Sequence, residues 1–313
     1  MLYSEQFINE KAAVVVPVKL PQIDHDVKIF MKRIDLVHPI ISGNKWYKLK
    51  YNIVEMNNLG FNTMLTFGGS FSNHIHAAAH AGKLFGFKTI GLIRGEEHLP
   101  LNSTLQAAVD DGLELHYVDR STFRERETKQ FLNSIKEKYG NVFILPVGGT
   151  NNIALKGCSE IVDQIDINFD YLCSASGSGG TFAGLVAGLK GSKKLIAFPA
   201  LKGSDFLEGV ISDLVEEYSG KQFSNWHLNT DYHFGGFAKL SKELIDFTHE
   251  FNELNGFELD YIYTNKMMFG ITDLIKKGFF KSGETVVAIH SGGLQGNEGM
   301  KEKVDKVLLQ EVV

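Results

Sequence analysis

The sequence predicts an α/β fold with largely parallel sheets in two domains, and two observations carry that prediction. Short apolar runs typical of buried strands alternate with segments typical of helices along almost the whole chain, a pattern of parallel sheets covered by helices. The chain has 313 residues, which exceeds the size at which one core usually stops growing, so two domains are favoured over one.

In the first half, the helix that begins near Lys45 has the clearest periodicity. Trp46, Leu49, Ile53 and Met56 recur at spacings of three and four, which is an apolar helical stripe, and Asn44 before it is the expected N-cap. The other expected elements are an extended segment at 11–20, strands at 27–35, 63–67, 89–93, 114–118 and 143–146, and helices at 77–86, 105–111 and 123–138.

In the second half, short turns rich in glycine and serine follow the expected strands. Such turns let the backbone approach a ligand closely. The expected elements are a helix from 152 to 164, strands at 171–174, 195–200 and 285–290, and helices at 182–189, 207–218 and 239–255.

Composition excludes several classes of protein. The formal net charge of -5 and a pI near 6.1 lack the basic character of a nucleic-acid binder, so a small-molecule partner is expected. The only cysteines, Cys158 and Cys173, are too few for a disulfide framework or a zinc site and are expected to be buried fillers. With no apolar run of about 18 residues, no membrane span is expected and the cytoplasm is the expected location.

Lys45 is the first candidate catalytic residue. It lies on the first turn of the expected helix, where the positive end of the helix dipole disfavours an ammonium. Partial desolvation there would lower its pKa and give the neutral amine that Schiff-base chemistry needs. A solvated lysine at a helix start is the alternative.

The loop from residue 176 to 181 is the strongest local signal for a ligand. It reads Ser-Gly-Ser-Gly-Gly-Thr between a strand and a helix, so backbone N–H groups converge where the helix dipole favours an anion. Its spacing is not the dinucleotide fingerprint, because Phe182 occupies the third glycine position, and it is not a P-loop, because neither a Lys-Ser nor a Lys-Thr pair follows at the required spacing. A phosphate cradle and a structural turn are both open.

A second turn, from Gly68 to Asn73, places Ser72 and Asn73 at a helix start. The two side chains offer donors and acceptors for a substrate carboxylate, although an ordinary N-cap is the alternative. His74, His76 and His80 follow, but the glutamate of a zinc-protease helix is absent, so no metal site is expected and His80 is expected to be structural.

The order of these motifs is more informative than any one of them. Gly43-Asn44-Lys45, Ser72-Asn73, the 176–181 loop, Tyr263-Thr264 and His290-Ser291-Gly292-Gly293 follow one another. This order resembles the pyridoxal-phosphate (PLP) family of 1-aminocyclopropane-1-carboxylate deaminase and D-cysteine desulfhydrase, which has the tryptophan synthase β-like fold (fold type II). The resemblance covers about residues 39–293.

The resemblance implies a role for each motif. Lys45 would bind PLP as a Schiff base and move protons, Ser72 would contact the substrate and assist proton transfer, and Asn73 would bond the cofactor's phenolate and contact the substrate. Thr264 would face the pyridine nitrogen, and Tyr263, as a catalytic residue, would lie near the cofactor or substrate. The cofactor phosphate would be held by Ser176, Gly177, Ser178, Gly179, Gly180 and Thr181.

Three departures from the family pattern bear on the substrate. Cyclopropane-type deaminases are expected to have a glutamate where this chain has Thr264, and threonine resembles the desulfhydrase branch. The family also has a tyrosine in a loop that is expected to match residues 231–236, where Phe234 is the expected substrate-contacting counterpart and Tyr232 could substitute. The run Leu294-Gln295-Gly296-Asn297 also differs from the family pattern.

These observations favour a PLP-dependent lyase or deaminase that acts on a small amino acid, by α,β-elimination of the D-cysteine type to pyruvate and ammonia. Three alternatives stay open: a 1-aminocyclopropane-1-carboxylate deaminase, a PLP-binding protein with little turnover, and a nucleotide-binding α/β protein that uses the 176–181 loop.

The resemblance also implies the domain organisation. Residues 1–47 and 149–313 would form the larger, PLP-binding domain and residues 48–148 the smaller α/β domain, each an open twisted sheet flanked by helices, with PLP in the cleft between them. A homodimer is expected.

Overall fold

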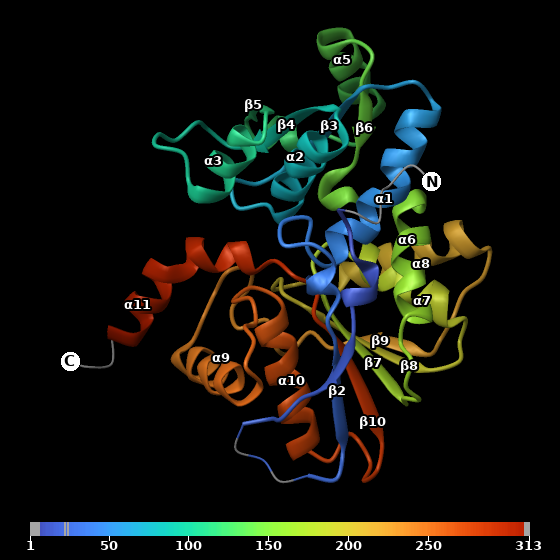
Figure 1. Cartoon of the computed structure of the whole chain (residues 1–313), viewed down its shortest axis with the longest axis vertical. Coiled ribbons are helices and arrows are strands. Elements are labelled where there is room, and N and C mark those ends of the chain that lie inside the picture. The colour runs from blue at the N-terminus through green and yellow to red at the C-terminus, as the bar shows by residue number, and fades with distance from the viewer. Residues whose placement is uncertain (1–6, 22, 24, 310–313) are drawn as a thin grey trace.

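The computed structural model describes residues 7–21, 23 and 25–309. Two separate sheets organise these residues, with the smaller sheet above the larger one in Figure 1. No helix among the described residues is long and apolar enough to cross a membrane.

The larger sheet has six strands in the order β1-β2-β10-β7-β8-β9. All neighbours pair in parallel except β1, which is an antiparallel edge strand on β2. The strands are β1 (Val15–Pro17), β2 (Lys28–Lys32), β7 (Tyr171–Ser176), β8 (Lys194–Pro199), β9 (Trp226–Leu228) and β10 (Thr285–Ile289).

Helices cover both faces of this sheet, because the side chains of its strands alternate between two apolar clusters. Leu172 and Val287 point into one cluster with α1, α6, α7 and α8, whereas Cys173 and Ala288 point into the other with α9 and α10. The helices are α1 (Asn44–Asn58), α6 (Asn152–Asp163), α7 (Gly180–Leu189), α8 (Phe206–Ser219), α9 (Lys242–Asn255) and α10 (Thr264–Lys276).

The smaller sheet has four parallel strands in the order β5-β4-β3-β6. Leu65 and Leu92 pack on α4 and α5 on one face, and Ile93 packs on α2 and α3 on the other. The elements are β3 (Thr63–Gly68), β4 (Lys88–Arg94), β5 (Leu113–Val118), β6 (Phe143–Leu145), α2 (Asn73–Phe85), α3 (Ser103–Asp110), α4 (Arg120–Arg124) and α5 (Lys129–Tyr139).

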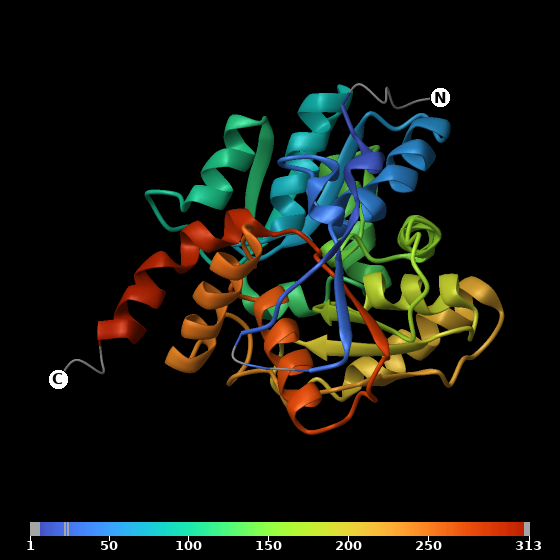
Figure 2. The same ribbon diagram turned by 60° about the horizontal axis from the view of Figure 1, so that its bottom comes forward.

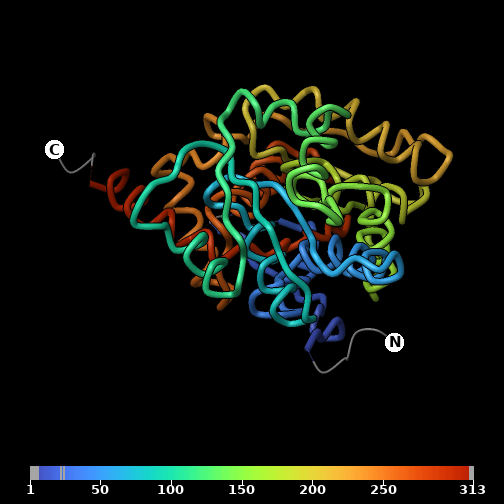
Figure 3. Tube along the Cα trace, turned by 90° about the horizontal axis from the view of Figure 1, so that it is seen from above, coloured from blue at the N-terminus to red at the C-terminus, as the bar shows by residue number. Residues whose placement is uncertain are grey.

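Short 3₁₀ helices and one further helix complete the description. Figure 2 shows α11 along the rim of the molecule beyond α9, and Figure 3 shows residues 63–145 lying over the later segments when the molecule is seen from above. These elements are η1 (Glu10–Ala12), η2 (Ile34–Val37), η3 (Val147–Gly149), η4 (Leu294–Met300) and α11 (Lys301–Leu309).

The predicted fold class, α/β with mostly parallel sheets flanked by helices, is confirmed. The predicted helix at 123–138 is wrong in its bounds, because the chain breaks at 125–128 and Thr128 caps a new helix by accepting the N–H of Phe131 at 3.2 Å. Helix α10 had no sequence prediction. The proposed boundary after residue 47 falls inside α1, and the division into domains stays a prediction.

Candidate active site

Lys45 lies on the first turn of α1, and the space at the residue before that helix admits no side chain. Gly43 has a φ of +63°, and a Cβ there would lie 1.9 Å from the carbonyl oxygen of Ser291. Only glycine fits such a backbone. The Asn44 N–H then donates to that same oxygen at 3.1 Å, so the turn after β10 fixes the start of the lysine helix.

The prediction that Asn44 caps α1 is wrong. Asn44 is the first helical residue, Gly43 holds the cap position, and no side chain caps this end. The Asn44 side chain has another use, because its Oδ1 accepts from Lys45 Nζ at 2.7 Å and its Nδ2 donates to Thr181 Oγ1 at 2.9 Å. Asn44 therefore joins the lysine to the 176–181 loop.

The surroundings of Lys45 lower its pKa to about 7, first through burial and then through the positive charge of Lys48. Its side chain is still partly exposed. Much more of the amine is therefore neutral near pH 7 than in an ordinary lysine, and the neutral amine is the form that attacks a carbonyl.

Lys48, one turn further along α1, is a site residue that the sequence analysis missed. It is only 2% exposed, and Nζ donates to Gly148 O at 2.9 Å, Thr150 Oγ1 at 2.9 Å and Ser178 Oγ at 3.3 Å. Within the described part of the chain no carboxylate pairs with it. Burial lowers its pKa. A buried ammonium without a counter-charge fits a site that receives an anion.

The 176–181 loop supplies the rest of that anion site. It joins β7 to the N-terminus of α7, whose first intrahelical bond runs from Ala183 N–H to Gly179 O, so the preceding N–H groups point outward. Ser178 Oγ contacts Thr150 Oγ1 at 2.9 Å. The buried hydroxyl of Ser176 has no hydrogen-bond partner among the described residues. Lys48 and this loop together can hold a phosphate.

Ser72 and Asn73 stand at the N-terminus of α2, as the sequence predicts. Ser72 is the N-cap and its oxygen accepts the N–H of Ile75 at 3.3 Å, which leaves its O–H free to donate. Asn73 Oδ1 accepts from Gln295 Nε2 at 2.6 Å. Asn73, Gln295 and Lys45 line one small cavity, so the structure brings Asn73 and Lys45 together.

Tyr263 and Thr264 begin α10 and are held by a carboxylate that the sequence analysis did not single out. Asp260 is 1% exposed and accepts the N–H groups of Ile262, Tyr263 and Thr264 at 2.7 to 3.0 Å. The hydroxyl of Thr264 also donates to Asp260 Oδ2 at 2.5 Å. Asp260 thus anchors this helix start, in the manner of an N-cap carboxylate.

The ring of Tyr263 meets the 176–181 loop at Gly177. A Cβ at Gly177 would lie 3.2 Å from Tyr263 Cε1, so glycine permits this close approach. Burial, together with the charge of Asp260, raises the pKa of the Tyr263 phenol. The phenol therefore stays protonated at neutral pH.

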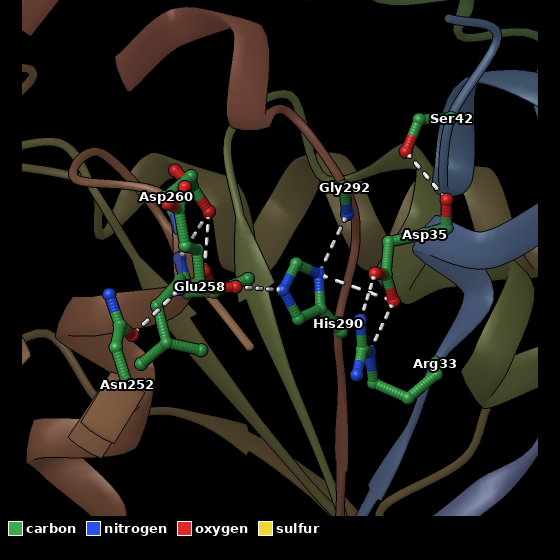
Figure 4. Close-up of polar contacts among 10 residues, drawn as sticks. Arg33, Asp35, Ser42, Asn252, Glu258, Asp260, His290 and Gly292 are labelled. Atoms are coloured by element: carbon green, nitrogen blue, oxygen red, sulfur yellow. Dashed lines mark hydrogen bonds and ion pairs between the residues drawn. The ribbon is translucent and has the colours of Figure 1, made fainter. Parts of the chain in front are cut away.

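A buried histidine fixes the turn after β10, and Figure 4 shows how it lies among its partners. His290 Nε2 donates to Glu258 O at 2.8 Å, and Nδ1 accepts from Gly292 N–H at 3.3 Å and lies 3.6 Å from Asp35 Oδ1. Arg33 donates two hydrogen bonds to the carboxylate of Asp35, at 2.8 and 2.7 Å. This network holds the turn that contacts Gly43.

The aromatic residues of the loop at 231–238 have different partners, and the substrate contact of Phe234 stays a prediction. The ring of Phe234 packs edge-on against Phe269 at 5.0 Å between centroids, whereas Phe237, 47% exposed, packs against Tyr263 at 6.1 Å. Tyr232 donates its hydroxyl to Asp273 at 2.7 Å. Phe237, not Phe234 or Tyr232, is therefore the residue of this loop beside Tyr263.

The histidines and cysteines that could have suggested a metal site are accounted for by other contacts or by burial. His74 Nε2 bonds Thr66 Oγ1 at 2.8 Å, and burial lowers the pKa of His74. His80 pairs with Asp111 at 2.7 Å. Among the described residues no group of three or more His, Cys, Asp or Glu side chains could hold a metal. Cys158 and Cys173 are both free and buried, as expected.

Comparison with known proteins agrees with this geometry. Residues 14–292 match the family model described as pyridoxal-phosphate dependent enzyme. A candidate 1-aminocyclopropane-1-carboxylate deaminase of Pyrococcus abyssi is 29% identical, with 88% of each chain covered. The mitochondrial bifunctional D-cysteine desulfhydrase/1-aminocyclopropane-1-carboxylate deaminase of Arabidopsis thaliana is 27% identical, with 92% of this chain and 77% of that protein covered.

A solved structure has the same fold over nearly its full length. It is that of an ACC deaminase homologue, with a TM-score of 0.82 and 25% identity, and 96% of this chain and 97% of that one are covered.

Proposed function

Because this chain belongs to the pyridoxal-phosphate-dependent enzymes, in the family of 1-aminocyclopropane-1-carboxylate deaminase and D-cysteine desulfhydrase, we propose that it eliminates sulfide from D-cysteine or a closely similar small amino acid. The products are pyruvate, ammonia and hydrogen sulfide. The observation that carries the proposal is the Lys45 amine, with a pKa of about 7, in a cavity that it shares with Asn73.

The residues around Lys45 fit pyridoxal phosphate. The unpaired charge of Lys48, the orphaned hydroxyl of Ser176 and the N-terminus of α7 suit its phosphate. Lys45 would hold its aldehyde carbon. Asn73 Oδ1 is occupied by Gln295, which leaves the amide N–H groups to donate to the phenolate oxygen.

When bound, pyridoxal phosphate supplies an electron sink for a carbanion at the substrate Cα. The chain's own residues then orient the substrate and transfer protons. Lys45 Nζ, whose lowered pKa favours the neutral amine, would take the Cα proton. The free O–H of Ser72 would donate to the substrate carboxylate. Protonated Tyr263 would close one side of the site beside Gly177.

The choice of D-cysteine over the cyclopropane substrate rests on Thr264. This position holds a hydroxyl where a carboxylate is expected in the cyclopropane-type deaminases. The Thr264 side chain is fully buried, and its hydroxyl donates to Asp260. A hydroxyl maintains a protonated pyridine nitrogen less well than a carboxylate does, and ring opening needs the deeper electron sink. β-Elimination, which expels a good leaving group, is less demanding.

Ring opening of 1-aminocyclopropane-1-carboxylate is the second candidate. The name of the Pyrococcus relative favours it, whereas that of the Arabidopsis relative includes both activities. The buried charge of Asp260 also lies one hydrogen bond behind Thr264. Hydrolysis of this substrate would give ketobutyrate and ammonia.

One experiment separates these candidates. The PLP-loaded protein is assayed for pyruvate release from D-cysteine, L-cysteine and D-serine, and for ketobutyrate release from 1-aminocyclopropane-1-carboxylate, with Lys45→Ala as the inactive control. The proposal expects D-cysteine to be the best substrate. Ketobutyrate as the main product would establish the second candidate, and full PLP loading without either product would identify a PLP-binding protein with little turnover.

The proposal includes the predicted homodimer, the cytoplasmic location and the two domains bounded after residues 47 and 148. Sedimentation velocity of the PLP-loaded protein tests the homodimer. A sedimenting species of one chain would contradict it.

A further inference from the structure

Four of the five arginines in the sequence line one pocket. The arginines are at positions 33, 94, 120, 124 and 126, and all except Arg33 line a pocket of about 350 Å³ together with Phe123 and Val147. Arg33 is committed to Asp35. Four guanidinium groups thus surround one pocket, although the exposed carboxylates of Glu125 and Glu127 lie beside them in the sequence.

These guanidinium groups are largely free of acidic partners. Within the described part of the chain, Arg94, Arg120 and Arg124 are exposed and form no hydrogen bond or ion pair through their side chains. Arg126 alone is engaged, with Glu127 at 3.1 Å and with the carbonyl of Phe123 at 3.1 Å, yet its buried Nε has no partner. The pocket therefore has several donors available to an anion.

The pocket lies at the ligand-binding edge of the smaller sheet but is separate from the candidate active site. Arg94 ends β4 and pairs in register with Val118, and Arg120 follows two residues later. The carboxyl ends of parallel strands are where ligands bind in open α/β sheets. None of its lining residues lines the Lys45 cavity.

An apolar cavity of about 510 Å³ adjoins the arginines. Arg126 and Val147 line both spaces, and the second is formed mainly by apolar side chains such as Leu59, Phe61 and Leu132. The two spaces are therefore neighbours, with Glu127 and Lys136 also in the lining of the larger one, an arrangement that suits a ligand with a charged head and an apolar body. Pockets of a few hundred Å³ are of the size that small ligands use.

We propose that this arginine pocket is a second binding site, which takes the phosphate group of a small organic phosphate while the apolar body of that ligand enters the adjoining cavity. Guanidinium groups match phosphate oxygens with two parallel N–H bonds, so several of them together favour a doubly charged oxyanion over chloride. This inference goes beyond the proposed function and does not depend on the substrate.

The pocket is connected to the candidate cofactor site through residues 147 and 148. Val147 lines the pocket and begins η3. The carbonyl oxygen of the next residue, Gly148, accepts a hydrogen bond from the buried ammonium of Lys48 at 2.9 Å. An occupant against Val147 therefore contacts the segment that positions Lys48. Binding at the two sites is expected to be coupled.

The test is calorimetry on the PLP-loaded enzyme after borohydride reduction, which fixes the cofactor so that added phosphate cannot replace it. Inorganic phosphate and phenyl phosphate are titrated in turn at constant ionic strength. Each is expected to bind one saturable site, with phenyl phosphate about tenfold tighter because its ring is buried. The double variant Arg94→Gln/Arg124→Gln is expected to weaken both about tenfold or more.

Two control variants distinguish specific binding in this pocket from general attraction of anions to positive charge. Lys129→Gln/Lys138→Gln removes the same charge from exposed positions of α5 and is expected to leave both affinities unchanged. Leu132→Asn is expected to weaken phenyl phosphate alone. Absence of a saturable signal, an equal loss in the lysine variant, or equal affinity for the two phosphates would overturn the proposal. None of these measurements depends on turnover.

Discussion

Lys48 donates a hydrogen bond from its buried ammonium to the hydroxyl of Ser178 at 3.3 Å, which ties the helix of Lys45 to the loop at the start of α7. The same ammonium reaches Thr150 on the segment after β6. One side chain thus joins three separate parts of the chain around the place where a phosphate would bind.

Replacing Lys48 by Met should weaken pyridoxal phosphate binding about tenfold or more, because a charge-assisted bond to the phosphate is lost. Binding of pyridoxal, which has no phosphate, should change little. Fluorescence titration with both compounds measures this, with Lys83→Met as a control at an exposed position of α2. An equal loss for both ligands would show that Lys48 only supports the fold.

The rate of cofactor attachment should depend on pH through Lys45. Its pKa of about 7 lies below the ordinary lysine value, so the reactive neutral amine increases from pH 6 to 8 and then levels off. Stopped-flow absorbance at saturating pyridoxal phosphate gives this profile. In Lys48→Met the midpoint should move upward, because the charge of Lys48 helps to lower the pKa of Lys45. A wild-type midpoint above pH 9 would contradict the environment described.

Gly43 and Gly60 form a matched pair for testing the turn before Lys45. Both have positive φ, but a Cβ at Gly43 would collide with Ser291 O, while one at Gly60 would meet open space. Gly60→Ala should cost only about 1 kcal/mol of unfolding free energy, from backbone strain. Gly43→Ala should cost more than about 3 kcal/mol or abolish activity. Thermal unfolding and cofactor absorbance distinguish them, and equal effects would rule out the Ser291 contact as the cause.

The hydroxyl of Thr264 should matter to stability as well as to chemistry. Thr264→Val removes a donor from buried Asp260 and should cost about 1–3 kcal/mol, whereas Thr272→Val, which removes a bond to a carbonyl of the same helix, should cost less. Urea denaturation compares them.

Thr264→Glu should be strongly destabilised, since its carboxylate would lie against that of Asp260. Adding Asp260→Asn should recover part of the loss. A fully stable Thr264→Glu protein with unchanged substrate choice would remove the argument that position 264 selects the reaction.

Phe237 and Phe234 provide a paired test of the 231–238 loop. Phe237→Tyr adds a hydroxyl next to Tyr263 at a half-exposed ring, so we expect a changed rate on D-cysteine or 1-aminocyclopropane-1-carboxylate with normal stability. Phe234→Tyr adds one against Phe269 and should lower stability by about 1 kcal/mol without changing substrate choice. Steady-state kinetics with both substrates would contradict this if only Phe234→Tyr altered the rates.

Periodicity was enough to predict the parallel strands and the start of the lysine helix, because these depend on local alternation and on spacings of three and four. It was not enough for Lys48. That residue differs from a surface lysine only because Thr150 and Ser178, more than a hundred residues later, close over it.

The ring contacts of residues 231–238 could not be predicted from the sequence. Phe234 and Ala238 both have positive φ, and such backbone turns redirect side chains in a way that spacing does not reveal. The start of α10, in contrast, had a readable signal, since Asp260 precedes Tyr263 and Thr264 at N-cap spacing. The break at 125–128 was hidden because charged residues on both sides fit one amphipathic helix.

The most direct test of the central claim is to identify the lysine that carries the cofactor. The protein is incubated with pyridoxal phosphate, reduced with borohydride, digested and analysed by peptide mass spectrometry. We predict a single pyridoxyl adduct on Lys45, none on Lys48, and no adduct in Lys45→Ala. An adduct on Lys48 or another lysine, or no adduct in the wild type, would contradict it.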